Sequence, residues 1–453
     1  MRHVLIFLTV ALIVKDTSQL GDPFILRAIA QGLCLLVGGL WLLTNLSVGL
    51  LVRYWPIWGY ITILLVSTYS ASNPQFVLAQ VASLVAVVLF FIAYHEKNIR
   101  LNKPRDLTLV NTTIVLYFGV TLISLVITPL FPNITYMSLF AGNAEGYESR
   151  FRGLFGMPAM MGAAAGLLVG MAWFGLQSWR LRVPAVVVGL LCLGLTLSRT
   201  FWLAMIIAGA ATSWFYYTNT VKMKATITGL GLGILVLAIV ANVEIRKESL
   251  THVLRPQSIS SLTGRTQLWE AGWKVLQDRP FIGYGYTSGA EALYKHESSI
   301  IDSQPKISSR ELAATTLHNG YLQSLLDSGL AGTAFYVAII LLSIARFVRY
   351  DKDRMFAPEF YAIVFLAVAN GGESVIYSAS MFHGILFWAL AVLAFSLRKS
   401  QAVYQRTAFK LTTEEHHRPE LEKPSARAGS VVAKGRHINH GHFTYRKPYT
   451  TNP

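Results

Sequence analysis

Residues 75–94 read QFVLAQVASLVAVVLFFIAY, a run without a charged side chain. A helix of about 20 apolar residues is long enough to cross the hydrocarbon core of a bilayer. Runs of this kind recur along the 453-residue chain, which is 53% hydrophobic and only 14% charged, whereas a typical soluble domain is about 25% charged. They are continuous rather than alternating, so they favour spanning helices over a β-barrel.

The recurring runs predict an all-α polytopic membrane protein with about 12 transmembrane helices. The candidate spans cover residues 3–15, 25–44, 54–70, 75–94, 107–128, 157–178, 182–198, 200–217, 224–242, 320–346, 358–373 and 380–397. The apolar run over residues 25–52 is long for one helix, so we expect it to tilt or bend. The first run lacks a convincing small-residue cleavage site, which indicates an uncleaved span rather than a signal peptide.

Basic residues predict the orientation of the spans, because Lys and Arg collect in short cytoplasmic loops. The loops after even-numbered spans contain Arg53, Lys97, Arg100, Lys103, Arg105, Arg180, Arg182, Lys222, Lys224, Arg346, Arg349, Lys352 and Arg354. We therefore expect these loops and both termini to be cytoplasmic. The polar insert after the ninth span then faces out.

The net charge of +16 has the same explanation. Basic loops and a basic tail lie beside anionic lipid, so we expect a lipid bilayer and no nucleic acid as the partner of this charge. Cys34 and Cys192 both fall inside apolar runs. They therefore indicate small hydrophobic side chains, with no disulfide or metal framework.

Composition divides the chain into five sections. Residues 1–128 contain N-terminal spans; residues 129–242 contain further spans and an outward loop over 129–157; residues 243–319 form the large polar insert; residues 320–397 contain the C-terminal spans. Residues 398–453 are rich in Lys, Arg, His, Pro and Thr, so we expect a basic, disordered cytoplasmic tail.

Arg199 is the charge that the predicted orientation disfavours most. It lies in Leu197-Ser198-Arg199-Thr200, between two spans with almost no loop and on the side that should contain few basic residues. Ser198 is a plausible N-cap for the eighth span, and an arginine at an outward helix N-terminus suits an anion such as phosphate. The alternative is an arginine that snorkels to lipid headgroups. We favour the anion site.

The polar insert contains a second candidate cation, Arg265, in TGRTQLWEAGW over residues 263–273. The apolar residues of this segment fall on one helical face, which predicts a helix lying at the membrane interface. Arg265 would be in its first turn, at a depth that suits a lipid-linked phosphate, although a plain surface arginine is equally compatible with the pattern. The string PFIGYGY over residues 280–286 predicts a turn that folds back on the spans.

His318 and Glu373 are the candidate acid–base residues. His318 opens His318-Asn319-Gly320 immediately before the tenth span, and histidine can act as a general base near neutral pH. A lone histidine can equally be structural. Glu373 lies at the outward end of the eleventh span, where it can be catalytic or can pair with an arginine; we prefer pairing. Motifs for nucleotide, dinucleotide, zinc-protease or serine-hydrolase chemistry are not found, and the tail histidines lack ligand spacing, so we expect no cofactor and no metal.

These motifs, in this order, resemble the O-antigen ligase and polymerase superfamily, including exopolysaccharide polymerases of the succinoglycan type. The resemblance rests on Ser198-Arg199, Gly264-Arg265 with Trp269, Pro280 with Gly283 and Gly285, and His318-Asn319 followed by Gly329 and Gly332. It covers roughly residues 150–350. Each motif is short, and their order together with the single large loop carries the resemblance.

The resemblance implies a GT-C-like, metal-independent glycosyltransferase with a periplasmic active site in the bacterial inner membrane. The donor would be a glycan on undecaprenyl diphosphate. Arg199 and Arg265 would hold the diphosphate, and His318 would deprotonate or orient the acceptor hydroxyl. Arg152, Arg310, Glu373 and Asn319 are candidates for supporting roles.

Two reactions fit this family, and they differ in the acceptor. A polymerase transfers to another lipid-linked repeat unit, and a ligase transfers to lipid A core. We favour the polymerase for exopolysaccharide or O-antigen, with a flippase and a chain-length regulator as further partners. A transporter of lipid-linked glycans or solutes is the alternative of another class; it would place ionisable residues at mid-span, whereas the polar residues here lie at the outward face.

Overall fold

The computed structural model describes residues 1–17, 24–101, 107–140, 147–216, 265–296, 317–351, 355–376, 379 and 381–397. The chain divides into a unit over Met1–Tyr404, which contains all of these residues, and a unit over Gln405–Pro453. The elements are α1 (Arg2–Asp16), α2 (Phe24–Asn45), α3 (Val48–Arg53), α4 (Trp55–Ser67), the 3-10 helix η1 (Thr68–Ser70), α5 (Pro74–Arg100), α6 (Thr108–Ile127), α7 (Pro132–Thr135), β1 (Tyr136–Phe140), β2 (Tyr147–Phe151), α8 (Pro158–Gly175), α9 (Trp179–Thr196), α10 (Arg199–Tyr216), α14 (Arg265–Asp278), α15 (Gly289–His296), α18 (Gly320–Tyr350), α19 (Ala357–Ala369) and a last helix (Phe382–Leu397).

The prediction of an all-α polytopic membrane protein is confirmed. In the described part of the chain, 6 helices are long and apolar enough to cross a membrane, and two shorter apolar helices accompany them. Each predicted span overlaps a helix except residues 224–242, which lie outside the described residues. The long run over residues 25–52 is broken where Ser47 caps α3 by accepting a hydrogen bond from the Leu50 N–H.

The outward loop predicted for residues 129–157 contains more regular structure than we expected. It forms α7 and an antiparallel hairpin of β1 and β2, in which Tyr136 lies opposite Phe151. The two rings pack edge to face with centroids 5.5 Å apart, and Phe151 is fully buried. An aromatic cross-strand pair of this kind stabilises the pairing of two short strands.

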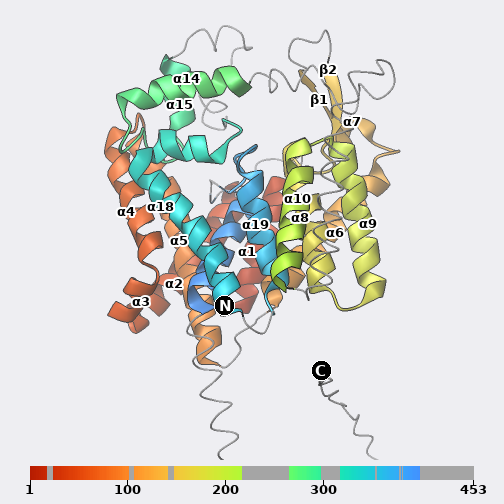
Figure 1. Cartoon of the computed structure of the whole chain (residues 1–453), viewed down its shortest axis with the longest axis horizontal. Helices are drawn as coiled ribbons and strands as arrows, with labels where there is room; N and C mark the ends of the chain where they lie inside the picture. The colour runs from red at the N-terminus through yellow and green to blue at the C-terminus, as the bar shows by residue number, and fades with distance from the viewer. Residues whose placement is uncertain are drawn as a thin grey trace, which may run out of the picture. The chain divides into compact units, whose positions relative to one another are not determined.

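A stripe of glycines on α8 sets the positions of α10 and α19. A Cβ atom at Gly162, Gly166 or Gly170 would lie 2.6 Å or less from a ring atom of an aromatic side chain on a neighbouring helix. Those aromatic residues are Phe201 on α10 and Phe365 and Tyr361 on α19. Small residues at four-residue spacing let helix backbones approach closely within a membrane. In Figure 1, α8 and α10 lie beside one another, with α19 next to them.

The kink in α18 is completed by the string PFIGYGY. Gly329 has a φ of 64°, which opens the helix and frees backbone groups on both sides. The Leu330 N–H donates to the Pro280 carbonyl at 2.7 Å, and the Leu326 carbonyl accepts from Tyr284 N–H at 2.8 Å. Such groups must be satisfied at a kink near the membrane. The predicted turn that folds back on the spans is therefore confirmed.

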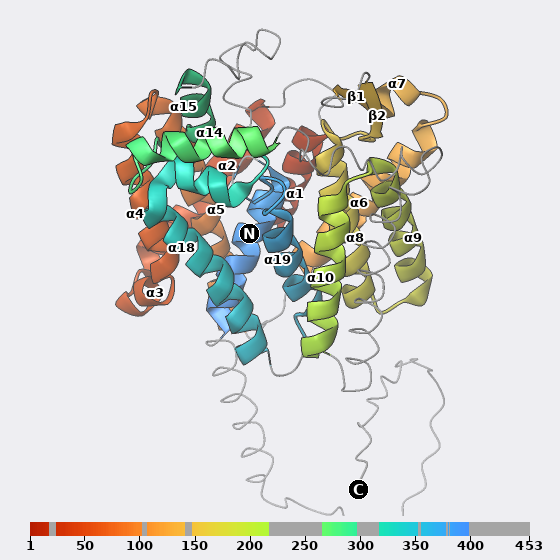
Figure 2. The same ribbon diagram turned by 45° about the horizontal axis from the view of Figure 1, so that its top comes forward.

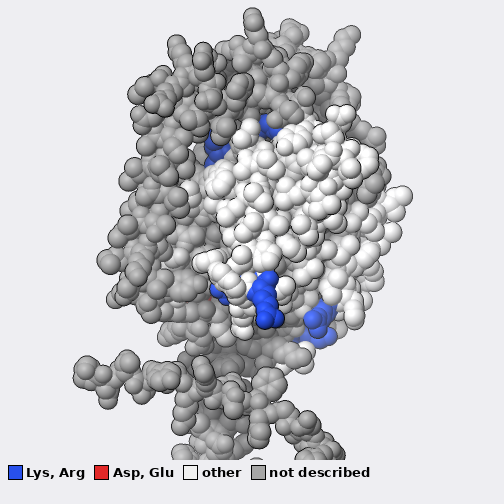
Figure 3. Space-filling view, turned by 90° about the vertical axis from the view of Figure 1, so that its right-hand side faces the viewer, with Lys and Arg blue, Asp and Glu red and all other residues white. Residues whose placement is uncertain are grey.

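The bundle has two distinct ends, which we call the α14 end and the α3 end. Figures 1 and 2 place α14, α15 and the hairpin at the first of them and α3 at the second. Figure 3 views the side on which α9 lies and shows a broad surface of uncharged side chains, with Lys and Arg near its ends. Val187 and Leu191 of α9 are exposed, as expected for residues that face lipid.

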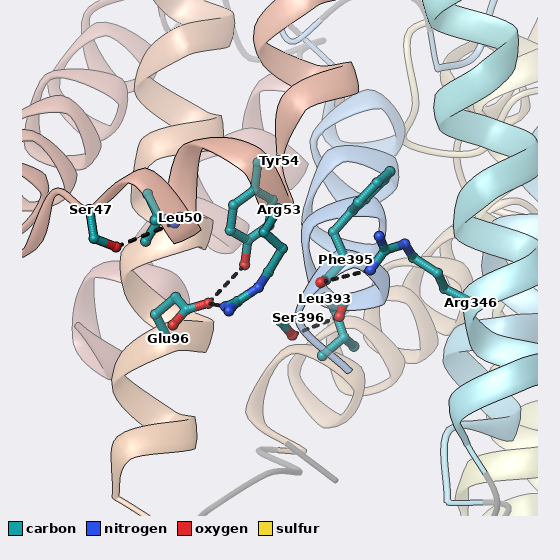
Figure 4. A network of polar contacts seen from close by, with 9 residues as sticks. All are labelled: Ser47, Leu50, Arg53, Tyr54, Glu96, Arg346, Leu393, Phe395 and Ser396. Atoms are coloured by element: carbon teal, nitrogen blue, oxygen red, sulfur yellow. Dashed lines mark hydrogen bonds and ion pairs between the residues drawn. The ribbon is translucent and has the colours of Figure 1, made fainter. Parts of the chain in front are cut away.

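A polar network joins several helices at the α3 end (Figure 4). Arg53 forms an ion pair with the buried Glu96 of α5, whose carboxylate also accepts the Tyr54 hydroxyl at 3.3 Å. Arg346 donates to the Phe395 carbonyl at 3.2 Å and lies over the same residue's ring. This end is therefore held by buried or partly buried charges.

Candidate functional site

The turn after α19, residues 370–373, contacts the first turn of α10 and the first turn of α18. The buried Asn370 accepts the Gly320 N–H through its backbone carbonyl at 2.8 Å, and its amide donates to the Tyr336 hydroxyl at 3.0 Å. A Cβ at Gly372 would lie 2.7 Å from the Thr200 side chain. Asn370 thus holds the first residue of α18, while Gly372 lies against the first turn of α10.

His318 and Glu373 form a pair across this junction. The Nδ1 atom of His318 lies 2.8 Å from Oε2 of Glu373. The histidine side chain is 44% exposed, whereas that of the glutamate is only 11% exposed. A carboxylate that accepts the Nδ1 proton leaves the lone pair on Nε2. The covered glutamate can therefore orient a ring that stays accessible.

The backbone around His318 is held in an unusual conformation. Its φ of 51° lies in the left-handed region, which few residues other than glycine adopt. The preceding carbonyl, of Leu317, accepts the Trp269 indole N–H at 2.9 Å. The Asn319 side chain caps α18 by accepting from the N–H groups of Tyr321 and Leu322. Asn319 therefore has a structural explanation at this position.

Arg199 is the first residue of α10, as the sequence predicts. The tight turn before it is made by Leu197, whose φ of 53° ends α9 in the left-handed region. Arg150 of the hairpin donates from Nε to the Thr196 carbonyl at 3.1 Å, so a second arginine lies at the same turn. A cation at the C-terminal end of α9 is also favoured by the helix dipole.

Arg265 is the first residue of α14, again as predicted, and its side chain lies outside what the structure describes. One turn later, the hydrogen bond from Trp269 to Leu317 fixes α14 beside the head of α18. Gly272 continues this contact, because a Cβ there would touch Leu322 and Leu326 at 3.5–3.6 Å. Figure 2 shows α14 lying across the top of α18.

The N-terminal ends of α10, α14 and α18 therefore gather near the turn after α19. Each presents the positive end of a helix dipole; at α18 the first N–H groups are already accepted by Asn319 and Asn370. With Arg199, this arrangement suits an anion such as a phosphate. An imidazole held by a carboxylate lies beside it, so the site combines an anion-binding region with a candidate general base.

The structure brings neither of the remaining supporting candidates, Arg152 and Arg310, to His318 among the residues that it describes. Arg152 donates from Nε to the Ile134 carbonyl at 3.1 Å, and its backbone N–H bonds to Thr135, so its described contacts are at the base of the hairpin. Arg310 lies outside the described residues. Of the supporting candidates, Glu373 is the one that the structure brings to His318.

Two tyrosines of the PFIGYGY string are structural. Burial raises the pKa of Tyr284, with Asp278 adding to the shift and Arg279 opposing it, and the hydroxyl donates to the Val275 carbonyl at 2.9 Å. Burial likewise raises the pKa of Tyr286 well above its usual range. Both phenols stay neutral at ordinary pH, so neither is a candidate nucleophile.

The sequence did not indicate two contacts of this site, that of the His318 ring with Glu373 and that of Arg150 with the turn before α10. We expected Glu373 to pair with an arginine, and the structure places the His318 ring against it. Residues 318 and 373 are separated by two helices, so no spacing rule connects them. The sequence does indicate a tight turn at this span end, because Glu373 directly follows Asn370-Gly371-Gly372.

One comparison with known proteins gives a match. Residues 184–337 match the model of the family described as O-Antigen ligase. The matched segment runs from within α9 to the middle of α18 and contains Arg199, Arg265 and His318. Among curated proteins, none matches the chain.

Proposed function

We propose that this chain, a member of the O-antigen ligase and polymerase superfamily through its residues 184–337, polymerises undecaprenyl-diphosphate-linked oligosaccharides at the periplasmic face of the inner membrane. Membership makes it a multi-pass membrane protein of the ligase or polymerase type, acting on lipid-linked glycans. The observation that carries the proposal is the His318–Glu373 pair beside the head of α10.

The donor diphosphate would lie at the N-terminal ends of α10 and α14, held by Arg199 and Arg265. His318 would take the proton of the acceptor hydroxyl at Nε2, while Glu373 accepts the Nδ1–H and holds the ring. The acceptor oxygen then bonds to the anomeric carbon as the bond to the diphosphate oxygen breaks. The two arginines and the helix dipoles stabilise the charge of the leaving diphosphate, and the proton passes from His318 to water.

Exposed aromatic residues support a site at the depth of lipid headgroups. Trp273 on α14 is 57% exposed and Phe281 is 68% exposed, in a segment outside the bundle. The backbone of Phe281 lies against Gly329 of α18, and its carbonyl accepts the Ala331 N–H, so this exposed aromatic residue adjoins a spanning helix. Aromatic residues concentrate where a membrane meets water. A lipid-linked phosphate occupies the same depth.

Several finer features belong to the same proposal. We expect the reaction to be metal-independent, both termini to be cytoplasmic, and a flippase and a chain-length regulator to act with the protein. The ligase alternative uses lipid A core as acceptor with the same donor site. A transporter of lipid-linked glycans would instead leave no donor at the periplasmic face when the chain is removed.

The glycan profile of a deletion strain tests the proposal. We expect single repeat units on the acceptor in place of long chains. Free lipid-linked polymer would point to the ligase reaction, and donor confined to the cytoplasmic leaflet would point to transport. Added EDTA should leave activity unchanged in purified protein; a requirement for a divalent metal would contradict the mechanism.

Complementation of the same strain tests the anion site. Arg199→Ala should fail to restore long chains, because the diphosphate loses a cation that stabilises its departure; the loss of rate should be about 10²–10³-fold. Arg180→Ala is the matched control, since Arg180 is an exposed arginine in the first turn of α9 at the opposite end of that helix. Long chains made by Arg199→Ala would overturn the assignment.

A further inference from the structure

Leu317, the residue before His318, has a buried hydrogen-bond partner that the mechanism above does not use. The Leu317 N–H donates to Oε1 of Gln323 at 3.2 Å. Both Leu317 and Gln323 are buried. The carbonyl of Leu317 accepts the Trp269 indole N–H, so the two peptide groups that flank Leu317 are each held by a side chain immediately before the left-handed His318.

Asp327 decides which way the Gln323 amide faces. Nε2 of Gln323 lies 3.2 Å from both carboxylate oxygens of Asp327, one helical turn further along α18. An ionised carboxylate only accepts hydrogen bonds, and the amide nitrogen only donates them. With its nitrogen committed to Asp327, Gln323 must present its oxygen to Leu317.

The Asp327 carboxylate is in turn held by the polar insert. It accepts the Thr287 N–H at 2.9 Å and the Gly289 N–H at the start of α15. Its side chain is fully buried, and its own backbone carbonyl accepts from Gly285 at 2.9 Å. One continuous chain of hydrogen bonds therefore runs from the insert through Asp327 and Gln323 to the N–H of Leu317.

We propose that Gln323, oriented by Asp327, is a positioning residue that holds His318 in its left-handed conformation. The inference rests on the proposed role of His318 as the base. A non-glycine residue stays in this region only where the surrounding structure fixes it. Gln323 holds the N–H of Leu317 and so helps to fix the backbone that leads into His318. The His318 ring then lies against Glu373 in a geometry suited to proton transfer.

Loss of the Gln323 carboxamide should affect catalysis more than binding. Without its oxygen, the Leu317 N–H is buried without an acceptor, so the backbone at Leu317 shifts to find another partner. The His318 ring then moves relative to Glu373 and to the acceptor hydroxyl, and small misplacements cost about 10²-fold in rate. Arg199 and the N-terminal ends of α10 and α14 keep their positions, so the affinity for the donor should be unchanged.

The test uses the full-length chain in nanodiscs with the lipid-linked glycan extracted from a strain that lacks the chain. Gln323→Met keeps the size of the side chain and removes both hydrogen-bonding groups. We expect kcat to fall about 10- to 100-fold with KM for the donor unchanged within about twofold. Ser328→Ala is the control, because it removes a buried hydroxyl from the same helix without touching Leu317. It should lower thermal stability and leave kcat unchanged.

A double variant separates a positioning role from a structural one. If Gln323 acts through His318, Gln323→Met should cause no further loss of rate in a His318→Ala background. An equal loss in both backgrounds, an unchanged kcat, or a parallel rise in KM would overturn the proposal. Full activity of His318→Ala alone would instead refute the proposed function itself, which makes the two failures distinguishable.

Discussion

Two carboxylates, one at each end of the bundle, have opposite relations to their partners. At the α3 end, Glu96 is fully buried against Arg53, whose side chain is 22% exposed, and it also accepts the Tyr54 hydroxyl. At the α14 end, Glu373 is covered while the His318 side chain is 44% exposed. In Figure 4 the first pair joins α3 and α5, with Tyr54 beside it.

The difference between the two pairs is chemical. A guanidinium keeps its charge at any ordinary pH and cannot take a proton, so the Arg53–Glu96 pair can only hold helices together. An imidazole held through one nitrogen keeps the other for a substrate. A buried acid beside a guanidinium therefore has a structural explanation, whereas an accessible proton acceptor beside a covered acid is a candidate for proton transfer.

The largest expected effect comes from replacing His318. His318→Asn removes the proton acceptor and keeps a residue that tolerates the left-handed backbone, so the fold should be preserved. We expect transfer to fall about 10³-fold, measured as release of the lipid diphosphate from the extracted donor. Activity above about a tenth of the original would show that His318 is not the base. The counterpart at the other end, Arg53→Met, should keep its transfer rate per folded molecule.

Glu373→Gln is expected to have the next largest effect. A glutamine can donate to Nδ1 and so favour the tautomer that carries its proton on Nε2, which cannot act as a base. We expect kcat to fall about 10²-fold or more, with unchanged donor KM. Glu96→Gln is the matched substitution at the α3 end and should leave kcat unchanged. Equal effects of the two substitutions on kcat would remove the distinction between the pairs.

Much of the fold could be predicted because burial in lipid imposes one requirement on every span. Long uncharged runs such as that over residues 75–94 must be helices, and α5 contains this run. Arg199 and Arg265 were expected in first turns, and they open α10 and α14. These features depend on residues that are close in sequence, where hydrophobicity and capping act.

The pairing of distant segments could not be predicted in the same way. Gly329 and the PFIGYGY string each indicate irregular backbone, but nothing in the sequence shows that they satisfy each other's hydrogen bonds. The partner of Glu373 and the orientation of Gln323 have the same character. Each depends on which helix N-termini lie together at one end of the bundle. The glycine stripe of α8 decides part of this arrangement through packing alone.

A moderate effect, on stability rather than on rate, is expected from the α3 end. Arg53→Met leaves the Glu96 carboxylate buried without its cation, and removal of one partner of such a pair costs about 3 kcal/mol. The midpoint of thermal unfolding should fall, whereas Glu373→Gln should lower it less because the histidine is more exposed. A larger fall for Glu373→Gln would mean that both pairs are primarily structural.

The smallest expected effect comes from the bond between α14 and the head of α18. Trp269→Phe keeps the aromatic ring and removes the N–H that binds the Leu317 carbonyl, a bond worth about 1 kcal/mol. Because Leu317 precedes His318, we expect kcat to fall by about fivefold, measured with the same donor-release assay. Trp273→Phe, one turn further along α14 and 57% exposed, is the matched control and should change kcat little. If both substitutions lower kcat equally, α14 acts through its contact with the membrane, and its bond to Leu317 does not help to hold the base.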